Sequence, residues 1–262
     1  MQGDILEALS AARRRDAVEA ERREPYADLV RRIGTMEPAR DFAAAFGGEG
    51  MRVIAELKKA SPSEGLIREA FAPMALAAEL AAAGAAALSV LCEPHRFLGD
   101  ERYLTAVRGT VGIPLLYKDF ITTRYQVAAA RAAGADAVLL IAAVLPDSEL
   151  VALLAQARTF GMRALVETHT EEEIRRAVGI GAELIGVNCR DLRTFKTDPA
   201  ITARLIGQIP DGIVRIAESG IRTRADLVSL HASGADGFLI GTTLMRAASP
   251  GTELENLIGK EL

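Results

Sequence analysis

The sequence predicts an α/β protein: a (β/α)8 TIM barrel with an N-terminal helical extension. Eight short apolar runs alternate with helical patterns, and glycine-containing turns between them recur at a spacing of about 50 residues. The 262 residues also match the roughly 250 that one such barrel needs. We therefore expect a single barrel domain over residues 1–262, with residues 1–50 as a helical extension that caps the barrel.

Four of the eight runs follow a repeated turn. Gly84, Gly134, Gly181 and Gly234 each end a helical pattern, because glycine adopts the left-handed conformation that closes a helix. The apolar runs after these turns are ALSVL, AVLLI, LIGVN and FLIG. The four remaining runs are RVIAEL, PLLYK, MRALVE and IVRIAE.

Helix starts lie between these runs. Thr170 with Glu173 forms the pattern of a capping box, and Thr223 precedes another helix. Strand and helix repeated eight times predict parallel pairing and a closed barrel. An open doubly wound sheet is the alternative, which the lack of a GxGxxG motif after the first run disfavours.

The N-terminal extension precedes this alternation. Residues 5–24 have apolar side chains at helical spacing among many charges, Pro25 interrupts the pattern, and residues 26–33 predict a second short helix. The pattern fits an interaction tail as well as a lid over the barrel.

Composition disfavours several classes of protein. The net charge of −4 provides no basic field for nucleic acid or a membrane surface. Cys92 and Cys189 are too few for a disulfide scaffold, and the three histidines lack metal-binding spacing. No apolar run reaches the roughly 18 residues of a membrane span, and no signal core begins the chain. We expect a cytoplasmic protein that holds no metal.

Ionisable or amide side chains follow five of the predicted strands. These residues are Glu56, Lys58, Lys118, Glu167, Asn188 and Glu218. One such residue is usually a solvated rim position, but barrels of this kind build their active sites at the carboxyl ends of the strands. Five strands that deliver polar groups to one mouth therefore predict a catalytic site.

Small residues follow the last two strands. Ser219 and Gly220 come after the seventh strand, and Gly241 and Thr242 after the eighth. Barrels commonly bind phosphate there, because small residues let backbone N–H groups approach an anion. The pattern predicts a phosphate ester without identifying it.

Six motifs in order resemble the indole-3-glycerol phosphate synthase family. They are IAELKKASPSEG, PLLYKDFI, ALVETHTEEE, IGVNCRDL, IAESGI and FLIGTTLM. The resemblance covers residues 5–245, including the extension, which covers the active site in that family. It implies ring closure, decarboxylation and dehydration of 1-(2-carboxyphenylamino)-1-deoxyribulose 5-phosphate in tryptophan biosynthesis, without a metal or organic cofactor. Association with other enzymes of that pathway is left open.

The resemblance also implies a role for each matching residue. The catalytic set would be Lys118 as the catalytic lysine, Lys58 and Glu167 as further acid–base residues, Glu56 as the residue that orients and tunes the lysines, and Asn188 and Glu218 as polar contacts. The phosphate site would comprise Ser219, Gly220, Gly241 and Thr242, with Ser61 and Ser63 near the same substrate. The apolar ring pocket would comprise Pro62, Phe97, Phe120, Leu139 and Leu192, with Arg190 toward the anthranilate carboxylate.

The chain departs from the family pattern at Tyr117 and at Leu91-Cys92-Glu93, which leaves the loop after the second strand in doubt. Asp119 is expected to face away from the mouth, because side chains alternate along a strand. Lys58 and Lys118 are expected to lie near each other, which would lower the pKa of one of them, and Glu56 and Glu167 oppose that shift.

Two other functions stay open on the sequence alone. One is a different sugar-phosphate barrel lyase or aldolase in which Lys118 forms a Schiff base. The other is a non-catalytic paralogue that binds a pathway enzyme through its N-terminal helices. The intact set of strand-end residues argues against the second.

Overall fold

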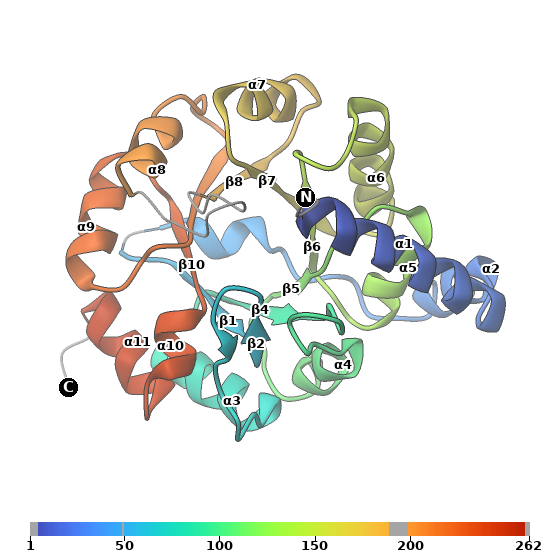
Figure 1. The fold of residues 1–262 in the computed structure, drawn as a ribbon, viewed down its shortest axis with the longest axis horizontal. Coiled ribbons are helices and arrows are strands. Elements are labelled where there is room, and N and C mark those ends of the chain that lie inside the picture. Colours follow the sequence, from blue (N-terminus) through green and yellow to red (C-terminus); the bar gives the residue numbers. More distant parts are fainter. Residues whose placement is uncertain (1–4, 49, 189–198, 260–262) are drawn as a thin grey trace.

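The computed structural model, drawn in Figure 1, describes residues 5–48, 50–188 and 199–259. Its centre is a closed barrel of parallel strands in the order β1-β10-β9-β8-β7-β6-β5-β4. The barrel strands are β1 (Val53–Leu57), β4 (Ala87–Leu91), β5 (Leu115–Lys118), β6 (Ala137–Ile141), β7 (Arg163–Thr168), β8 (Leu184–Asn188), β9 (Val214–Glu218) and β10 (Gly237–Ile240). The predicted barrel and all eight of its strands are confirmed.

Helices surround the barrel, and each barrel strand leads into one. The helices that follow strands are α3 (Pro73–Ala83), α4 (Glu101–Arg108), α5 (Arg124–Ala132), α6 (Asp147–Thr159), α7 (Glu171–Gly179), α8 (Pro199–Ile206), α9 (Arg224–Ala232), α10 (Thr242–Arg246) and α11 (Pro250–Ile258). A small antiparallel pair, β2 (Ala60–Ser61) and β3 (Gly65–Leu66), forms the loop after β1. Among the described helices, none combines the length and the apolar character needed to span a membrane.

The predicted helix ends are confirmed with one correction. The four repeated glycines all have positive φ, as the left-handed helix end requires. Thr170 caps α7 by accepting a hydrogen bond from the N–H of Glu173. A capping box also requires the Glu173 side chain to accept from the N–H of Thr170. This part of the prediction is wrong, because the Glu173 carboxylate accepts from the N–H of His169 instead.

Side chains alternate between the inside of the barrel and the layer of helices outside it. Ile54, Leu116, Leu165 and Ile216 are buried in the cluster that fills the barrel. The next inward position on each of these strands is two residues further on and lies nearer the carboxyl end. Those positions are occupied by Glu56, Lys118, Glu167 and Glu218. The barrel is therefore apolar below and charged at its carboxyl ends.

The N-terminal extension reaches both ends of the barrel. Its helices α1 (Ile5–Arg23) and α2 (Tyr26–Ile33) lie against α5 (Figure 1). The short helix η1 (Ala43–Phe46) follows, and Phe46 packs on Gly237 at the amino end of β10. The chain has to pass to this end before β1, because every strand of a parallel barrel begins there. Residues from α1, in contrast, line a cavity at the carboxyl ends.

Candidate active site

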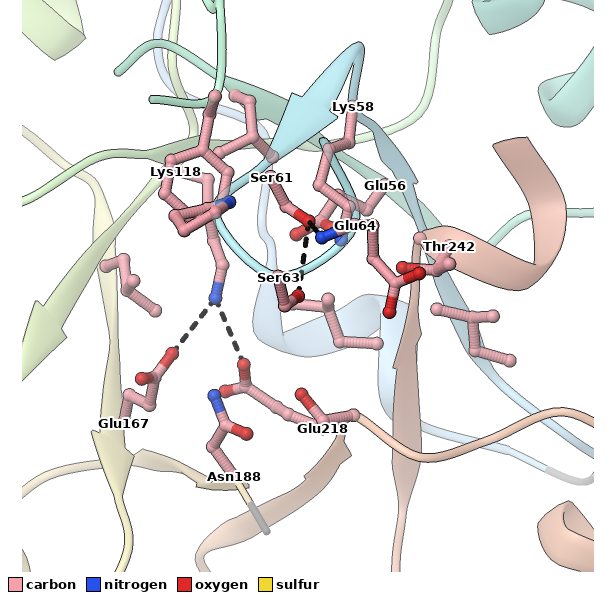
Figure 2. Close-up of a pocket in the computed structure, with 18 of the residues that line it drawn as sticks. Glu56, Lys58, Ser61, Ser63, Glu64, Lys118, Glu167, Asn188, Glu218 and Thr242 are labelled. Carbon is pink, nitrogen blue, oxygen red and sulfur yellow. Dashed lines mark hydrogen bonds and ion pairs between the residues drawn. The ribbon is translucent and has the colours of Figure 1, made fainter. Parts of the chain in front are cut away.

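A cavity of about 360 Å³ opens at the carboxyl ends of the barrel strands. This volume is within the range of small-ligand pockets, about 300–1,000 Å³. The polar residues that line it include Glu56, Lys58, Ser61, Ser63, Lys118, Glu167, Asn188, Glu218, Ser219 and Thr242. Most of them are labelled in Figure 2, where they point toward a common space from several strands.

Glu56 and Lys58 form an ion pair at the end of β1. Lys58 Nζ lies 2.6 Å from Glu56 Oε1, and the two side chains are 13% and 5% exposed. The pair forms because residues two apart in an extended chain share a face, here the inside of the barrel. A largely buried pair of this kind holds its lysine in one position.

Lys118 lies between two carboxylates on the opposite side of the cavity. Its Nζ donates to Glu167 Oε2 at 3.0 Å and to Glu218 Oε2 at 3.1 Å, as the dashed lines in Figure 2 mark. Lys118 is the last residue of β5, Glu167 the last but one of β7, and Glu218 the last of β9. Alternate strands therefore supply one layer of side chains in the barrel. None of the three side chains is more than 13% exposed.

Burial and neighbouring charges set the protonation of these groups. Burial acts to lower the pKa of Lys118, but Glu167, Glu218 and Glu56 outweigh it and raise that pKa above its ordinary value. Burial acts to raise the pKa of Glu167, yet Lys118 and His169 bring it below its ordinary value. Burial raises the pKa of Glu218, and the charge of Glu167 adds to this effect. Lys118 is therefore a charged ammonium, and the expected lowering of a lysine pKa does not occur at this residue.

Two glycines make room for the carboxylates. A Cβ on Gly186 of β8 would lie 2.0 Å from Glu218 Oε1, and a Cβ on Gly241 would lie 2.2 Å from Glu56 Oε1 and 3.0 Å from Lys58 Nζ. Real Cβ atoms do not approach other atoms so closely, so a side chain at either position would displace a charged group.

The residues predicted to bind phosphate gather on one side of the cavity. Ser219, Gly220, Gly241 and Thr242 all line it. Ser219 and Gly220 have φ values of 67° and 74°, so the chain turns sharply as it leaves β9. Gly241 immediately precedes α10, and Ser61 and Ser63 face the same space from the loop after β1 (Figure 2).

The residues predicted to bind the aromatic ring form an apolar wall. Pro62, Phe97, Phe120 and Leu139 line the cavity. The ring centroids of Phe97 and Phe120 are 6.2 Å apart in a tilted arrangement, which is typical of packed aromatic pairs. Arg190 and Leu192, which were predicted to belong here, lie outside the described residues.

Helix α1 forms part of the same wall. Leu6 and Leu9 are buried in the cluster that includes Phe120 and Leu139, and Ile5 and Phe97 pack against it. All three α1 residues line the cavity. Leu9 lies four residues beyond Ile5 and three beyond Leu6, so the three side chains share the apolar face that the sequence shows.

An ion-pair network anchors α1 beside the reacting centre. Arg13 donates from Nε to both carboxylate oxygens of Asp119 at 3.0 Å, and from Nη2 to Oδ2 at 2.7 Å. Arg13 also pairs with Asp16, which lies 2.7 Å from His95 Nε2 in the loop after β4. Asp119, expected to face away from the mouth, does turn to α1, yet it also lines the cavity.

Glu93 shapes the loop that the sequence left in doubt. Its carboxylate is fully buried and accepts hydrogen bonds from the N–H groups of His95, Arg96 and Phe97 at 2.7–2.9 Å. One buried carboxylate therefore holds the turn that carries Phe97 into the cavity. Tyr117 is buried in the layer outside the barrel and does not line the cavity.

Several lining residues were not identified from the sequence. Three of the apolar ones, Leu91, Ile141 and Leu239, occupy inward positions that strand alternation could have indicated. Arg222 and Arg246 also line the cavity, and Arg246 pairs with Glu64. Within the described residues, no three His, Cys, Asp or Glu side chains are grouped so that they could hold a metal ion.

Comparison with known proteins finds one matching family and relatives that are similar over nearly the whole chain. The family model described as indole-3-glycerol phosphate synthase matches residues 6–257. The indole-3-glycerol phosphate synthase of Acidithiobacillus ferrooxidans is 44% identical over 97% of this chain and 98% of its own. Indole-3-glycerol phosphate synthase 2 of Streptomyces coelicolor is 44% identical over 99% and 98%, and the Chromobacterium violaceum protein is 45% identical over 97% of each.

Solved structures with lower identity share the fold alone. A 3-hexulose-6-phosphate synthase superposes with a TM-score of 0.66 at 14% identity, covering 81% of this chain and 100% of that one. The thiamine phosphate pyrophosphorylase of Pyrococcus furiosus gives a TM-score of 0.59 at 15% identity, covering 79% and 93%. Both superpositions support the barrel.

Proposed function

The chain belongs to the indole-3-glycerol phosphate synthase family, and from that premise we propose how its own residues carry the reaction. The enzyme converts 1-(2-carboxyphenylamino)-1-deoxyribulose 5-phosphate into indole-3-glycerol phosphate, CO₂ and water, a step of tryptophan biosynthesis. The appearance of indole fluorescence on incubation with this substrate tests the activity directly. No signal from the folded enzyme would favour the non-catalytic alternative.

Lys118 is the acid of the ring-closing step. The ring carbon that bears the carboxylate attacks the ketone, and negative charge develops on the ketone oxygen. An ammonium can neutralise that charge by giving up a proton as it forms. Lys118 suits this task because Glu167 and Glu218 hold it charged and fixed, at 3.0 and 3.1 Å. Loss of CO₂ then restores the aromatic ring.

Lys58 and Glu167 serve the dehydration. This step needs an acid for the leaving hydroxyl and a base for a carbon-bound proton. Lys58, oriented by Glu56 at 2.6 Å, supplies the acid. Glu167 is a weak base while Lys118 is charged, because that charge lowers its pKa. Once Lys118 has given its proton to the substrate, this effect is removed and Glu167 becomes more basic.

The phosphate binds at the ends of β9 and β10. Ser219, Gly220, Gly241 and Thr242 present small side chains and backbone N–H groups to the cavity there. Arg222 lines the same region and adds a positive charge. Anchoring the phosphate at this side leaves the sugar chain to extend toward the two lysines.

A raised pKa of Lys118 also bears on the aldolase alternative. A Schiff base requires the neutral amine as nucleophile. The two adjacent carboxylates stabilise the ammonium and so oppose that chemistry. Borohydride treatment in the presence of substrate should therefore trap no adduct on Lys118, and a trapped adduct would revive the alternative.

Phe120 tests the apolar ring pocket, which we call the ring slot. Phe120→Ala should raise KM by about tenfold, because a packed aromatic pair is worth about 0.5–1.5 kcal/mol beyond its burial and about 1.4 kcal/mol is a factor of ten. Steady-state kinetics gives the value. Phe71→Ala is the matched control, since Phe71 packs on Tyr103 and does not line the cavity. An unchanged KM in Phe120→Ala would place the slot elsewhere.

The second prediction concerns α1, which we propose to be a cap on the substrate. Arg13→Gln leaves the fully buried Asp119 side chain without its partner, so the helix should lose its anchor. We expect KM to rise at least about tenfold, or roughly 1.4 kcal/mol, with a smaller change in kcat. Leu6 and Leu9 would then no longer close the ring slot.

Arg22→Gln is the control for this prediction. Arg22 lies on the same helix but is 69% exposed and pairs only within α1, with Glu19. Its replacement should leave KM unchanged. If Arg13→Gln lowered the melting temperature and left KM at the parental value, α1 would stabilise the fold without capping the substrate.

A further inference from the structure

His169 lies beside the proposed acid–base centre, and the reaction described above assigns it no task. It follows the last residue of β7 directly and is two residues beyond Glu167, so the two side chains lie on the same side of the chain. The His169 side chain is only 15% exposed. Its charge therefore acts on Glu167 with little screening by solvent.

The imidazole ring lies between two carboxylates. Nε2 is 3.5 Å from Glu167 Oε1, and Nδ1 is 3.4 Å from Glu173 Oε2. Neither ring nitrogen makes a hydrogen bond of good geometry, but both carboxylates lie close enough to attract a charged ring. Two flanking negative charges stabilise the imidazolium over the neutral ring.

Glu173 is fixed by its own helix. Its Oε2 accepts from the backbone N–H of His169 at 2.6 Å, and its N–H donates to the Thr170 hydroxyl at 3.2 Å. Both bonds are local to the start of α7 and do not depend on the cavity. The ring thus has a rigid anionic support behind it.

Glu167 in turn lies between the Lys118 ammonium and the His169 ring. Lys118 contacts Oε2 at 3.0 Å (Figure 2), and His169 faces Oε1. The carboxylates that act on the ring are Glu167 from β7, Glu173 from α7 and Glu218 from β9, and the Lys118 ammonium from β5 lies on the far side of Glu167. Burial acts to lower the pKa of His169, but these carboxylates raise it overall.

We propose that His169 is a positioning residue: as an imidazolium supported by Glu173, it keeps Glu167 ionised and oriented while Lys118 gives up its proton. This inference rests on the proposed role of Lys118. As the proton moves from Nζ to the ketone oxygen, Lys118 no longer compensates Glu167, whereas the imidazolium still does. The second cation also weakens the hold of Glu167 on the ammonium, which makes Lys118 a stronger acid.

His169→Gln should lower kcat about tenfold, as expected when one pKa unit of driving force is lost, with KM within about twofold of the parent. The acid limb of the kcat/KM profile should move to higher pH by about 1–3 units, because an opposite charge within 4–6 Å lowers a carboxyl pKa by that amount. Parental kcat and pH profile in this variant would overturn the proposal. So would a lower melting temperature with an unchanged profile, which indicates a purely structural role.

Glu173→Gln provides a second variant with an opposite signature. The amide oxygen can still accept from the His169 N–H, but the charge that supports the imidazolium is gone. The alkaline limb of the activity profile should then shift to lower pH than in the parent. Activity should recover when the pH is lowered enough to protonate the ring. Glu172→Gln is the matched control, since Glu172 is exposed in the same turn and pairs with Arg175. If the Glu173→Gln profile matched that of Glu172→Gln, the inference would be wrong.

Nuclear magnetic resonance of the ¹⁵N-histidine-labelled enzyme without substrate reads the ring directly and decides the matter even if His169→Gln does not fold. We expect a doubly protonated His169 ring at pH 7 in the parent and a neutral one in Glu173→Gln. A neutral ring in the parent would reject the inference and leave the role of Lys118 intact. Parental kcat in Lys118→Met would instead reject the proposed role of Lys118, on which this inference rests.

Discussion

Lys118→Met is expected to turn over at least about a hundredfold more slowly than the parent while binding substrate within roughly tenfold. Methionine keeps much of the side-chain volume but cannot donate a proton. Because the ammonium acts on charge that develops only in the transition state, its loss should appear in kcat and leave substrate affinity largely intact. Single-turnover kinetics and a substrate titration measure the two quantities separately.

Lys59→Met is the control for this experiment. Lys59 follows Lys58 directly, but it does not line the cavity. Its replacement removes the same charge from the mouth of the barrel and should leave kcat unchanged. Near-normal kcat in Lys118→Met would remove this lysine from the chemistry. A large rise in KM with unchanged kcat would make it a counter-ion to the substrate.

The same variant should change the pH dependence of stability. Without the ammonium, Glu167 and Glu218 are two buried carboxyl groups with no shared cation, so the pKa of each should rise above its unfolded value, about 4.3. A carboxyl group with a raised pKa favours the folded state at low pH and loses that contribution as the pH rises. Lys118→Met should therefore become less stable relative to the parent as the pH increases above about 5, which melting temperatures will show.

Gly241→Val is expected to lose substrate binding and turnover together. A Cβ at this position would lie 2.2 Å from Glu56 Oε1 and 3.0 Å from Lys58 Nζ. The substitution would displace the Glu56–Lys58 ion pair and also place methyl groups in the proposed phosphate site. We expect kcat/KM to fall by at least about a hundredfold, the scale of a lost electrostatic contact in a transition state.

Gly241→Ala separates the two effects. It carries the Cβ that displaces Glu56, but not the branched methyl groups that would reach the phosphate. It should lower kcat more than it weakens binding of indole-3-glycerol phosphate. Gly112→Val serves as the control, because a Cβ there meets nothing within 4 Å. Unaltered product affinity in Gly241→Val would reject the phosphate site at this position.

The barrel and the edge at which the polar groups meet could both be predicted from the sequence. Both follow from local patterns: the strand runs, the helix-ending glycines and the period-two alternation of side chains. Parallel strands all end at one rim, so Lys118, Glu167 and Glu218 had to face the same mouth once the strands were recognised. The resemblance to a known family then named the chemistry, which periodicity could not.

The sequence could not determine which charged groups pair. Lys118 meets Glu167 and Glu218 across 49 and 100 residues of chain, and Arg13 meets Asp119 across 106. Such pairings depend on strand register and barrel closure, which bring distant positions to within 3 Å. The role of Glu93 in holding the Phe97 loop could not be predicted either. A carboxylate that accepts hydrogen bonds from backbone N–H groups produces no periodic pattern in the sequence.

The protonation states of the buried carboxyl groups depend on how the chain folds. Glu167 and Glu218 are the same residue type in similar positions after apolar runs, yet burial and charge shift their pKa values in opposite directions. Glu167 contacts Lys118 at one oxygen and faces His169 at the other, whereas Glu218 shares one lysine with a neighbouring anion. The effect of a charge depends on distance and on the surrounding dielectric, and both exist only once the chain has folded.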